Sequence, residues 1–152
     1  MTWYDMLVQI VSAFFGTFGF GILFNIRGKR LIFSSIGGML AWALYLVLYS
    51  AHPNEVLCYF IVSLVASLYA EIMARALKTP AITFCILSLI PLVPGRSLYY
   101  TIASVMGGSA EGFFGKAAYT LSLAAALSLG IILVAAFSKN FKNRIHHTKK
   151  NN

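Results

Sequence analysis

Four long stretches of the sequence contain almost no charged residue, and they limit what the chain can fold into. Each holds about 20 residues, the length at which an α-helix crosses the hydrocarbon core of a bilayer. Of the 152 residues, 59% are hydrophobic and only 11% are charged, whereas soluble domains average about 25% charged residues. Together with a mean hydropathy of +0.79, this predicts an all-α integral membrane protein. The four stretches are Met6–Phe24, Leu31–Tyr49, Val56–Ala74 and Ala117–Phe137.

A fifth apolar region, Ala81–Met106, is interrupted by two prolines and a glycine. Pro91 and Pro94 each remove a backbone donor and disfavour helix in the residue before them. The part before the prolines is too short to cross about 30 Å at 1.5 Å per residue. We therefore predict a broken fourth span, with half-helices Ala81–Leu89 and Ser97–Met106 joined by a non-helical Pro-Leu-Val-Pro-Gly elbow. A re-entrant loop that dips into the membrane is the alternative.

Basic residues gather in three segments: the loops after the first and third spans, and the C-terminal tail. With five crossings, all three segments fall on one side, which the positive-inside rule places in the cytoplasm. The sequence thus predicts five transmembrane spans with the N-terminus outside, a transmembrane domain over residues 1–137 and a basic cytoplasmic tail over 138–152. The tail is expected to lie along an anionic leaflet or to stay disordered. The basic residues in the three segments are Arg27, Lys29, Arg30, Arg75, Lys78, Lys139, Lys142, Arg144, Lys149 and Lys150.

Small residues recur every four positions in the last apolar stretch, at Ala118, Ser122, Ala126 and Gly130. Such a stripe lets two helix backbones approach closely. Packing inside the bundle and packing against a partner subunit explain the stripe equally well, and both interpretations stay open.

The elbow carries the residues that we expect to bind substrate. A charge inside a bilayer is costly and is rarely present without a role, and discontinuous helices are where transporters commonly place their substrate sites. The guanidinium of Arg96, next to a helix N-terminus with free N–H donors, suits a carboxylate. The alternative is structural: Arg96 reaches the outer interface or pairs with Glu71 or Glu111. The candidate substrate-binding residues are Pro94, Gly95, Arg96, Ser97, Tyr99 and Thr101.

Glu71 is the acid near the end of the third apolar stretch, four residues before Arg75. An ion pair with Arg75 in the favourable order is one interpretation. The other makes Glu71 a proton carrier, because a short carboxylate cannot extend to the interface as an arginine can. The sequence shows no Ser/His/Asp arrangement, no metal-ligand spacing and no cofactor motif, so we expect a protein that is not an enzyme and has no cofactor or metal.

Three stretches resemble a known family. They are FGILFNIRGKR at Phe20–Arg30, SSIGGMLAWALYL around Trp42, and AEIMARALKTP followed by IPLVPGRSLY within residues 70–99. The chain is similar to the threonine/serine exporter family, specifically to a small subunit that corresponds to the C-terminal membrane half of full-length exporters. The family often has a small residue after Pro94-Gly95, so Arg96 is a departure from its pattern.

The resemblance implies a secondary exporter that works by alternating access in the inner membrane of a bacterium. It also implies a larger partner subunit with five spans and a cytoplasmic domain. The cargo would be threonine and serine, or small dicarboxylates such as succinate, and each of these brings a carboxylate to the elbow. The alternative function is a non-transporting scaffold or assembly subunit of a membrane complex.

Overall fold

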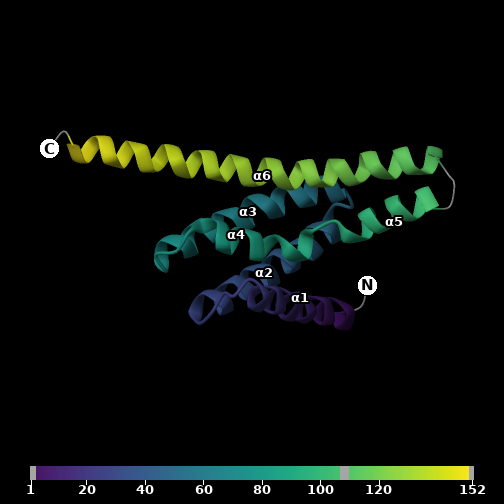
Figure 1. Cartoon of the computed structure of the whole chain (residues 1–152), viewed down its shortest axis with the longest axis horizontal. Coiled ribbons are helices and arrows are strands. Elements are labelled where there is room, and N and C mark those ends of the chain that lie inside the picture. Colours follow the sequence, from purple (N-terminus) through teal and green to yellow (C-terminus); the bar gives the residue numbers. More distant parts are fainter. Residues whose placement is uncertain (1–2, 107–109, 151–152) are drawn as a thin grey trace.

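The computed structural model describes residues 3–106 and 110–150, and this part of the chain contains helices and connections but no strand. Figure 1 shows the helices along the chain. They are α1 (Trp3–Leu23), α2 (Lys29–Ala51), α3 (Glu55–Ala76), α4 (Ala81–Leu89), the 3-10 turn η1 (Ile90–Leu92), α5 (Gly95–Met106) and α6 (Ala110–Lys150). The expected all-helical membrane protein is confirmed at this level.

Four helical segments are long and apolar enough to cross a membrane, judged by length and composition. A fifth crossing is added if the bent pair Ala81–Leu92 and Gly95–Met106, whose axes meet at 57°, counts as one span. The four complete segments are Trp3–Leu23, Lys29–Ala51, Glu55–Ala76 and Gly112–Lys139.

Local sequence explains several helix ends. Asn54 precedes α3, and its side-chain oxygen accepts a hydrogen bond from the backbone N–H of Leu57 at 3.2 Å, as an N-cap residue does. Gly28 precedes α2 with a φ of 68°, a conformation that costs glycine nothing but strains other residues. Both caps lie in short loops, so successive helices run back beside each other.

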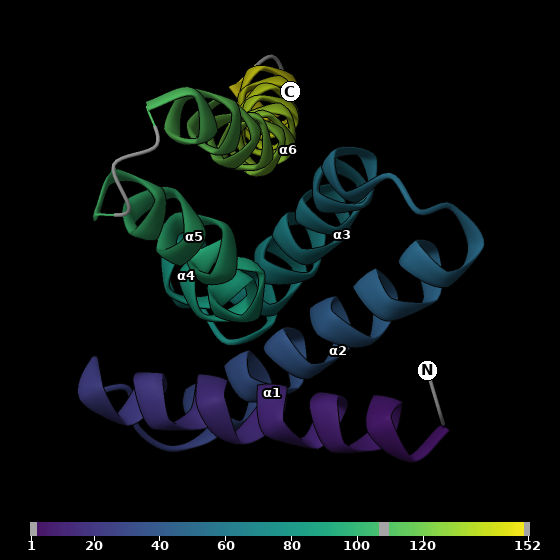
Figure 2. The ribbon, with the colours of Figure 1, turned by 90° about the vertical axis from the view of Figure 1, so that its right-hand side faces the viewer.

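The helices form one bundle in which α1 and α6 lie on opposite sides (Figure 2). α1 packs mainly on α2, and α6 packs on α3 and α5, while α2, α3 and α4 contact one another. The centre is closed by apolar side chains from these three helices, η1 and α6, including Val62, Phe84, Leu92 and Leu123. The short α4 is thus held in the core, and the turn that follows it is held as well.

Glycines allow the closest helix contacts. A Cβ on Gly38 of α2 would lie 2.2 Å from Oγ1 of Thr17 on α1. A Cβ on Gly130 of α6 would lie 1.8 Å from Oγ of Ser63 on α3 and 3.0 Å from the backbone N of Leu64. The stripe that includes Gly130 therefore contributes to packing inside the bundle at this position.

The helices alternate in direction, and α5 continues across the molecule in the general direction of α4 (Figure 1). The α1–α2 loop, the α3–α4 loop and the C-terminal end of α6 lie at one end of the bundle, which we call the basic end. The three basic segments of the sequence therefore lie at the same end of the bundle.

α6 differs from the sequence-based expectation at both ends. The last apolar stretch was predicted to begin at Ala117, but α6 begins at Ala110, and Lys116 within this helix donates from Nζ to Oγ of Ser104 on α5 at 2.7 Å. The C-terminal end of the helix reaches Lys150, so most of the expected tail is helical. At 1.5 Å per residue, α6 is about 60 Å long and must extend beyond a hydrocarbon core of about 30 Å.

Candidate substrate site at the helix break

The backbone between α4 and α5 is irregular over only a few residues. Pro91 and Leu92 belong to η1, and α5 begins at Gly95, two residues before the predicted start at Ser97. Val93 donates its backbone N–H to Ile90 O at 3.1 Å, and Gly95 donates to Val93 O at 2.6 Å. Because Pro94 has no N–H to continue the helix, the chain bends here and α5 starts with a new N-terminus.

That new N-terminus leaves donors available. Leu98 donates to Pro94 O at 2.9 Å, whereas no backbone acceptor is found for the N–H groups of Arg96 and Ser97 in the described part of the chain. The first N–H groups of a helix carry a partial positive charge and favour anions. The guanidinium of Arg96 adds a full charge at the same place.

Residues on both sides of the break line a pocket of about 300 Å³, which we call the elbow pocket. The wall on the side of the break is formed by Pro91, Val93, Pro94, Gly95, Arg96 and Ser97. The remaining wall comes from α1, α2 and α3 and consists of Gln9, Trp42, Tyr45, Leu46, Tyr49, Glu55 and Tyr59.

Aromatic rings form much of the pocket wall that comes from α2 and α3. Tyr45 is at the centre of this group, with ring centroids 5.1 Å from Trp42, 5.7 Å from Tyr49 and 5.5 Å from Tyr59. Tyr59 is buried and meets Tyr45 edge to face. Such rings pack as rigid apolar plates whose faces attract cations.

The elbow pocket contains one side chain of each charge. The guanidinium carbon of Arg96 lies 5.8 Å from the ring centroid of Tyr100, and the Arg96 side chain is exposed. Glu55 accepts a hydrogen bond from the hydroxyl of Tyr119 on α6. No ion pair joins Arg96 to Glu55 among the residues that the structure describes, so each charge can contact a ligand group.

Four of the six predicted substrate residues come together, and two lie elsewhere. Pro94, Gly95, Arg96 and Ser97 line the elbow pocket. Tyr99 is 69% exposed on the outside of α5. Thr101 is turned toward α6, where its Oγ1 lies 3.1 Å from Oγ1 of Thr120. Thr101 therefore joins two helices.

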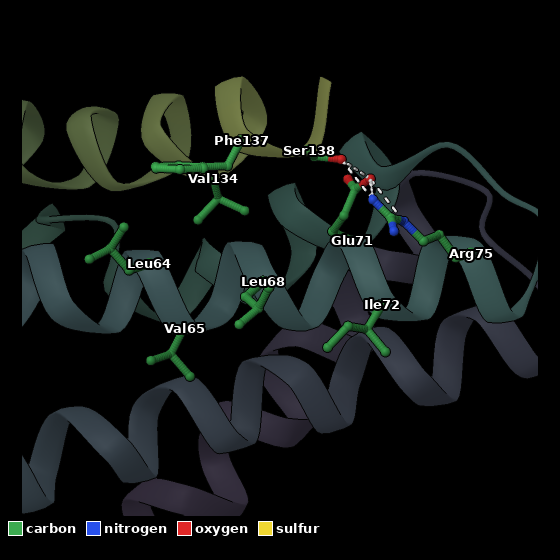
Figure 3. A pocket seen from close by; sticks show the side chains of 9 residues that line it. All are labelled: Leu64, Val65, Leu68, Glu71, Ile72, Arg75, Val134, Phe137 and Ser138. Atoms are coloured by element: carbon green, nitrogen blue, oxygen red, sulfur yellow. Dashed lines mark hydrogen bonds and ion pairs between the residues drawn. The ribbon is translucent and has the colours of Figure 1, made fainter. Parts of the chain in front are cut away.

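Glu71 lies in a different pocket, of about 510 Å³, between α3 and α6 (Figure 3). Its Oε1 is 3.2 Å from Nη2 of Arg75, and Ser138 of α6 donates a hydrogen bond to it. Arg75 also donates to Ser138 Oγ at 3.1 Å. The rest of the lining is apolar: Leu64, Val65, Leu68, Ile72, Val134 and Phe137. Arg75 rather than Arg96 is the ionic partner of Glu71.

Sequence reasoning missed the residues that α1, α2 and α3 bring to the elbow pocket. One signal was available, because Trp42, Tyr45 and Tyr49 are spaced by three and four residues and share a helix face. Gln9, a polar residue within an apolar stretch, was a weaker signal. For metal binding, no group of three or more His, Cys, Asp or Glu side chains was found in the described residues.

Comparison with known proteins is informative at the level of family. Separate comparisons with curated proteins and with solved structures gave no match. The family described as "Threonine/Serine exporter, ThrE" matches residues 9–137, a range that includes α1 from Gln9 onward, all of α2 to α5 and most of the apolar part of α6. The chain is therefore a multi-pass membrane protein that belongs to the threonine/serine exporter family.

Proposed function

We propose that this chain is the membrane subunit of a secondary exporter that moves serine and threonine out of the cell by alternating access. The observation that carries the proposal is the elbow pocket, where Arg96 and free backbone N–H groups meet at a helix break. Irregular backbone survives in a membrane only where protein or a wet cavity surrounds it. A cavity at such a break is the usual position of a transporter's substrate site.

The bent pair α4–α5 acts in this proposal as one broken span, which makes five spans in all. The 57° bend supports this view, because a re-entrant loop would need α5 to turn back toward the start of α4. Basic residues at one end of the bundle support a cytoplasmic location for that end. The N-terminus then lies outside and the C-terminus inside, in the inner membrane of a bacterium.

A larger subunit of the same family, with five spans and a cytoplasmic domain, completes the exporter in this proposal. The exposure of Arg96 supports a partner, because a charge facing hydrocarbon costs at least about 2.5–3.5 kcal/mol on insertion scales. A partner helix that covers the elbow pocket would remove this cost and enclose the substrate.

Amino acids suit the elbow pocket better than dicarboxylates do. Arg96 and the N-terminus of α5 bind the carboxylate of the substrate, and Glu55 with the neighbouring rings binds its ammonium group. Succinate would bring a second carboxylate close to Glu55, and two like charges repel. Succinate export is therefore the second candidate, because the elbow pocket offers favourable contacts to only one of the two carboxylates of succinate.

Glu71 is assigned the coupling of export to protons. It is a carboxylate on an apolar face, and its contacts with Arg75 and Ser138 join α3 to α6. A change of protonation would alter those contacts and so the packing of the two helices. Protonation of Glu71 would thereby be coupled to a movement of α3 relative to α6.

Efflux from a bacterial strain that lacks exporters tests the proposal. Labelled serine, threonine and succinate are followed with this chain alone, with a larger exporter-family subunit from the same organism alone, and with both. We expect flux only with both, preference for the amino acids, and no flux with Arg96→Gln despite normal membrane insertion. Lys29→Gln, which removes a charge outside the elbow pocket, is the control. No flux in any combination, with both chains in the membrane, would favour the scaffold function; full flux with Arg96→Gln would remove the site.

A further inference from the structure

A second polar pocket lies at the basic end of the bundle, away from the elbow pocket. Its volume is about 440 Å³, and it is formed where the α1–α2 loop meets the α3–α4 loop. We call it the basic-end pocket. Its polar lining comes from Asn25, Arg27, Arg30, Thr79 and Thr83, with Pro80 beside them.

The same backbone motif ends both helices that lead into this pocket. After α1, Asn25 has a φ of 56° and Ile26 donates to Gly21 O at 2.9 Å. After α3, Lys78 has a φ of 48° and Thr79 donates to Ala74 O at 3.0 Å. A left-handed residue followed by this six-to-one bond is the Schellman motif. The two loops that form the pocket are therefore ordered by their own backbone bonds.

The charges in the pocket are positive and, among the residues that the structure describes, form no ion pair with a carboxylate. Nε of Arg27 donates to Oδ1 of Asn25 at 3.1 Å, which orients the guanidinium and leaves its terminal nitrogens available. Neither Arg27 nor Arg30 forms an ion pair in the part of the chain that the structure describes, and the lining contains no acid. Two adjacent guanidinium groups attract an anion with several oxygens.

The N-terminus of α4 adds donors to the same pocket. Pro80 is its N-cap residue and gives no side-chain cap, and Thr83 donates its backbone N–H to Pro80 O at 3.2 Å. The N–H groups of Ala81 and Ile82 have no backbone acceptor in the described residues. Helix N-termini of this kind bind phosphate groups, and the hydroxyl of Thr83 lies in the same turn.

We infer that the basic-end pocket binds a phosphate group, with Arg27, Arg30 and the N-terminus of α4 as its ligands. The pocket lies at the ends of the apolar helices α1 and α3, so the proposed spans place it at the depth of lipid headgroups. An anionic phospholipid and a free phosphate share this chemistry. The inference is independent of the transported substrate, because the basic-end and elbow pockets share no residue.

Binding of a fluorescent phosphatidylglycerol to the full-length chain in neutral detergent micelles tests the inference by anisotropy. Arg27→Gln with Arg30→Gln should weaken binding about tenfold, since two charge-assisted contacts are lost. The matched control is Lys29→Gln with Lys78→Gln, which removes the same charge at the same end but outside the pocket. It should change binding less than twofold. Labelled phosphatidylcholine measures binding that does not depend on anionic charge.

Two further arms complete the test. Arg27→Lys with Arg30→Lys keeps both charges but loses the planar guanidinium groups, which can bind a phosphate through two nitrogens. It should therefore still weaken binding several-fold. This variant also replaces the glutamine variant if that one does not insert into the membrane. Competition by inorganic phosphate at constant ionic strength separates the sources: displacement at millimolar concentration identifies a free phosphate, and none identifies the lipid. Equal losses in the arginine and lysine pairs, unchanged binding in the Arg→Lys pair, or equal binding of phosphatidylcholine would overturn the inference.

Discussion

Glu55 lines the elbow pocket together with Arg96, and this pair of opposite charges is the basis for expecting an amino acid as cargo. Glu55→Gln keeps an oxygen that can accept from Tyr119 but removes the charge that would attract an ammonium group. We expect serine and threonine efflux to fall about tenfold, equivalent to about 1.4 kcal/mol, and succinate efflux to stay the same or rise. Tyr119→Phe, which removes only the hydrogen bond to Glu55, is the control. Unchanged serine efflux in Glu55→Gln would contradict the assignment.

Glu71 allows a separate test at residue scale. In proteoliposomes, Glu71→Gln should abolish serine flux driven by a pH gradient but keep serine exchange at equal pH, because exchange requires no net proton movement. Arg75→Gln breaks the same ion pair without removing the carboxylate and should retain some gradient-driven flux. Parallel loss of both fluxes in Glu71→Gln would instead indicate that the residue only holds α3 against α6.

Local sequence was sufficient to find four of the thirteen residues that line the elbow pocket. Pro94, Gly95, Arg96 and Ser97 are consecutive, and the cost of placing a charge beside a helix break was visible without a structure. Glu55 was missed because it comes from a separate helix, and only the bundle brings it to the pocket. Tyr99 was assigned by its position on α5, but the helix turns it to the outside.

At the scale of the helices, the contact between α3 and α6 depends on the absence of a side chain at Gly130. A Cβ there would lie 2.9 Å from Cβ of Ser63 and 3.0 Å from a backbone nitrogen, so rotating the serine hydroxyl does not relieve the clash. Gly130→Ala should lower the stability of the folded chain by about 1–3 kcal/mol, the usual cost of overpacking. Thermal unfolding in detergent measures it.

Gly115→Ala on the same helix is the matched control, because a Cβ at Gly115 meets nothing within 4 Å. Alanine is the better helix former, so this variant should unfold at an equal or higher temperature than the parent chain. If both variants unfold at the same temperature, the close approach of α3 and α6 at Gly130 does not contribute to the stability of the folded chain.

The end of the first half-helix was predicted correctly, whereas the starts of the second half-helix and of α6 were predicted too late. The first half-helix ends at Leu89 as predicted, since the prolines that follow exclude a regular helix. The last span was predicted to start at Ala117, where the apolar stretch begins, but α6 starts at Ala110. Lys116 instead lies within the helix and bonds Ser104, a tertiary contact that the charge pattern does not reveal.

For the whole molecule, the direction of each helix determines which ends share a side of the membrane. Figure 1 places the α1–α2 loop and the end of α6 at the basic end. With Cys58 and Cys85 replaced by alanine, single cysteines at Lys29, His52 and Lys139 can be labelled in intact cells with a maleimide that does not cross membranes. We expect labelling at His52 only, and at the other two positions after permeabilisation.

Lys139 is the position that distinguishes five crossings from four. If α4 and α5 form one broken span, an odd number of crossings separates the N-terminus from Lys139, so Lys139 reacts like Lys29. If α4 and α5 form a re-entrant loop, α6 starts on the same side as the end of α3, so Lys139 reacts like His52. Labelling of Lys29 but not His52 in intact cells would show that the chain has the opposite orientation. Lys139 would still be compared with Lys29 in the same way. The relation of Lys139 to Lys29 therefore tests the broken span, on which the elbow pocket as a transport site depends.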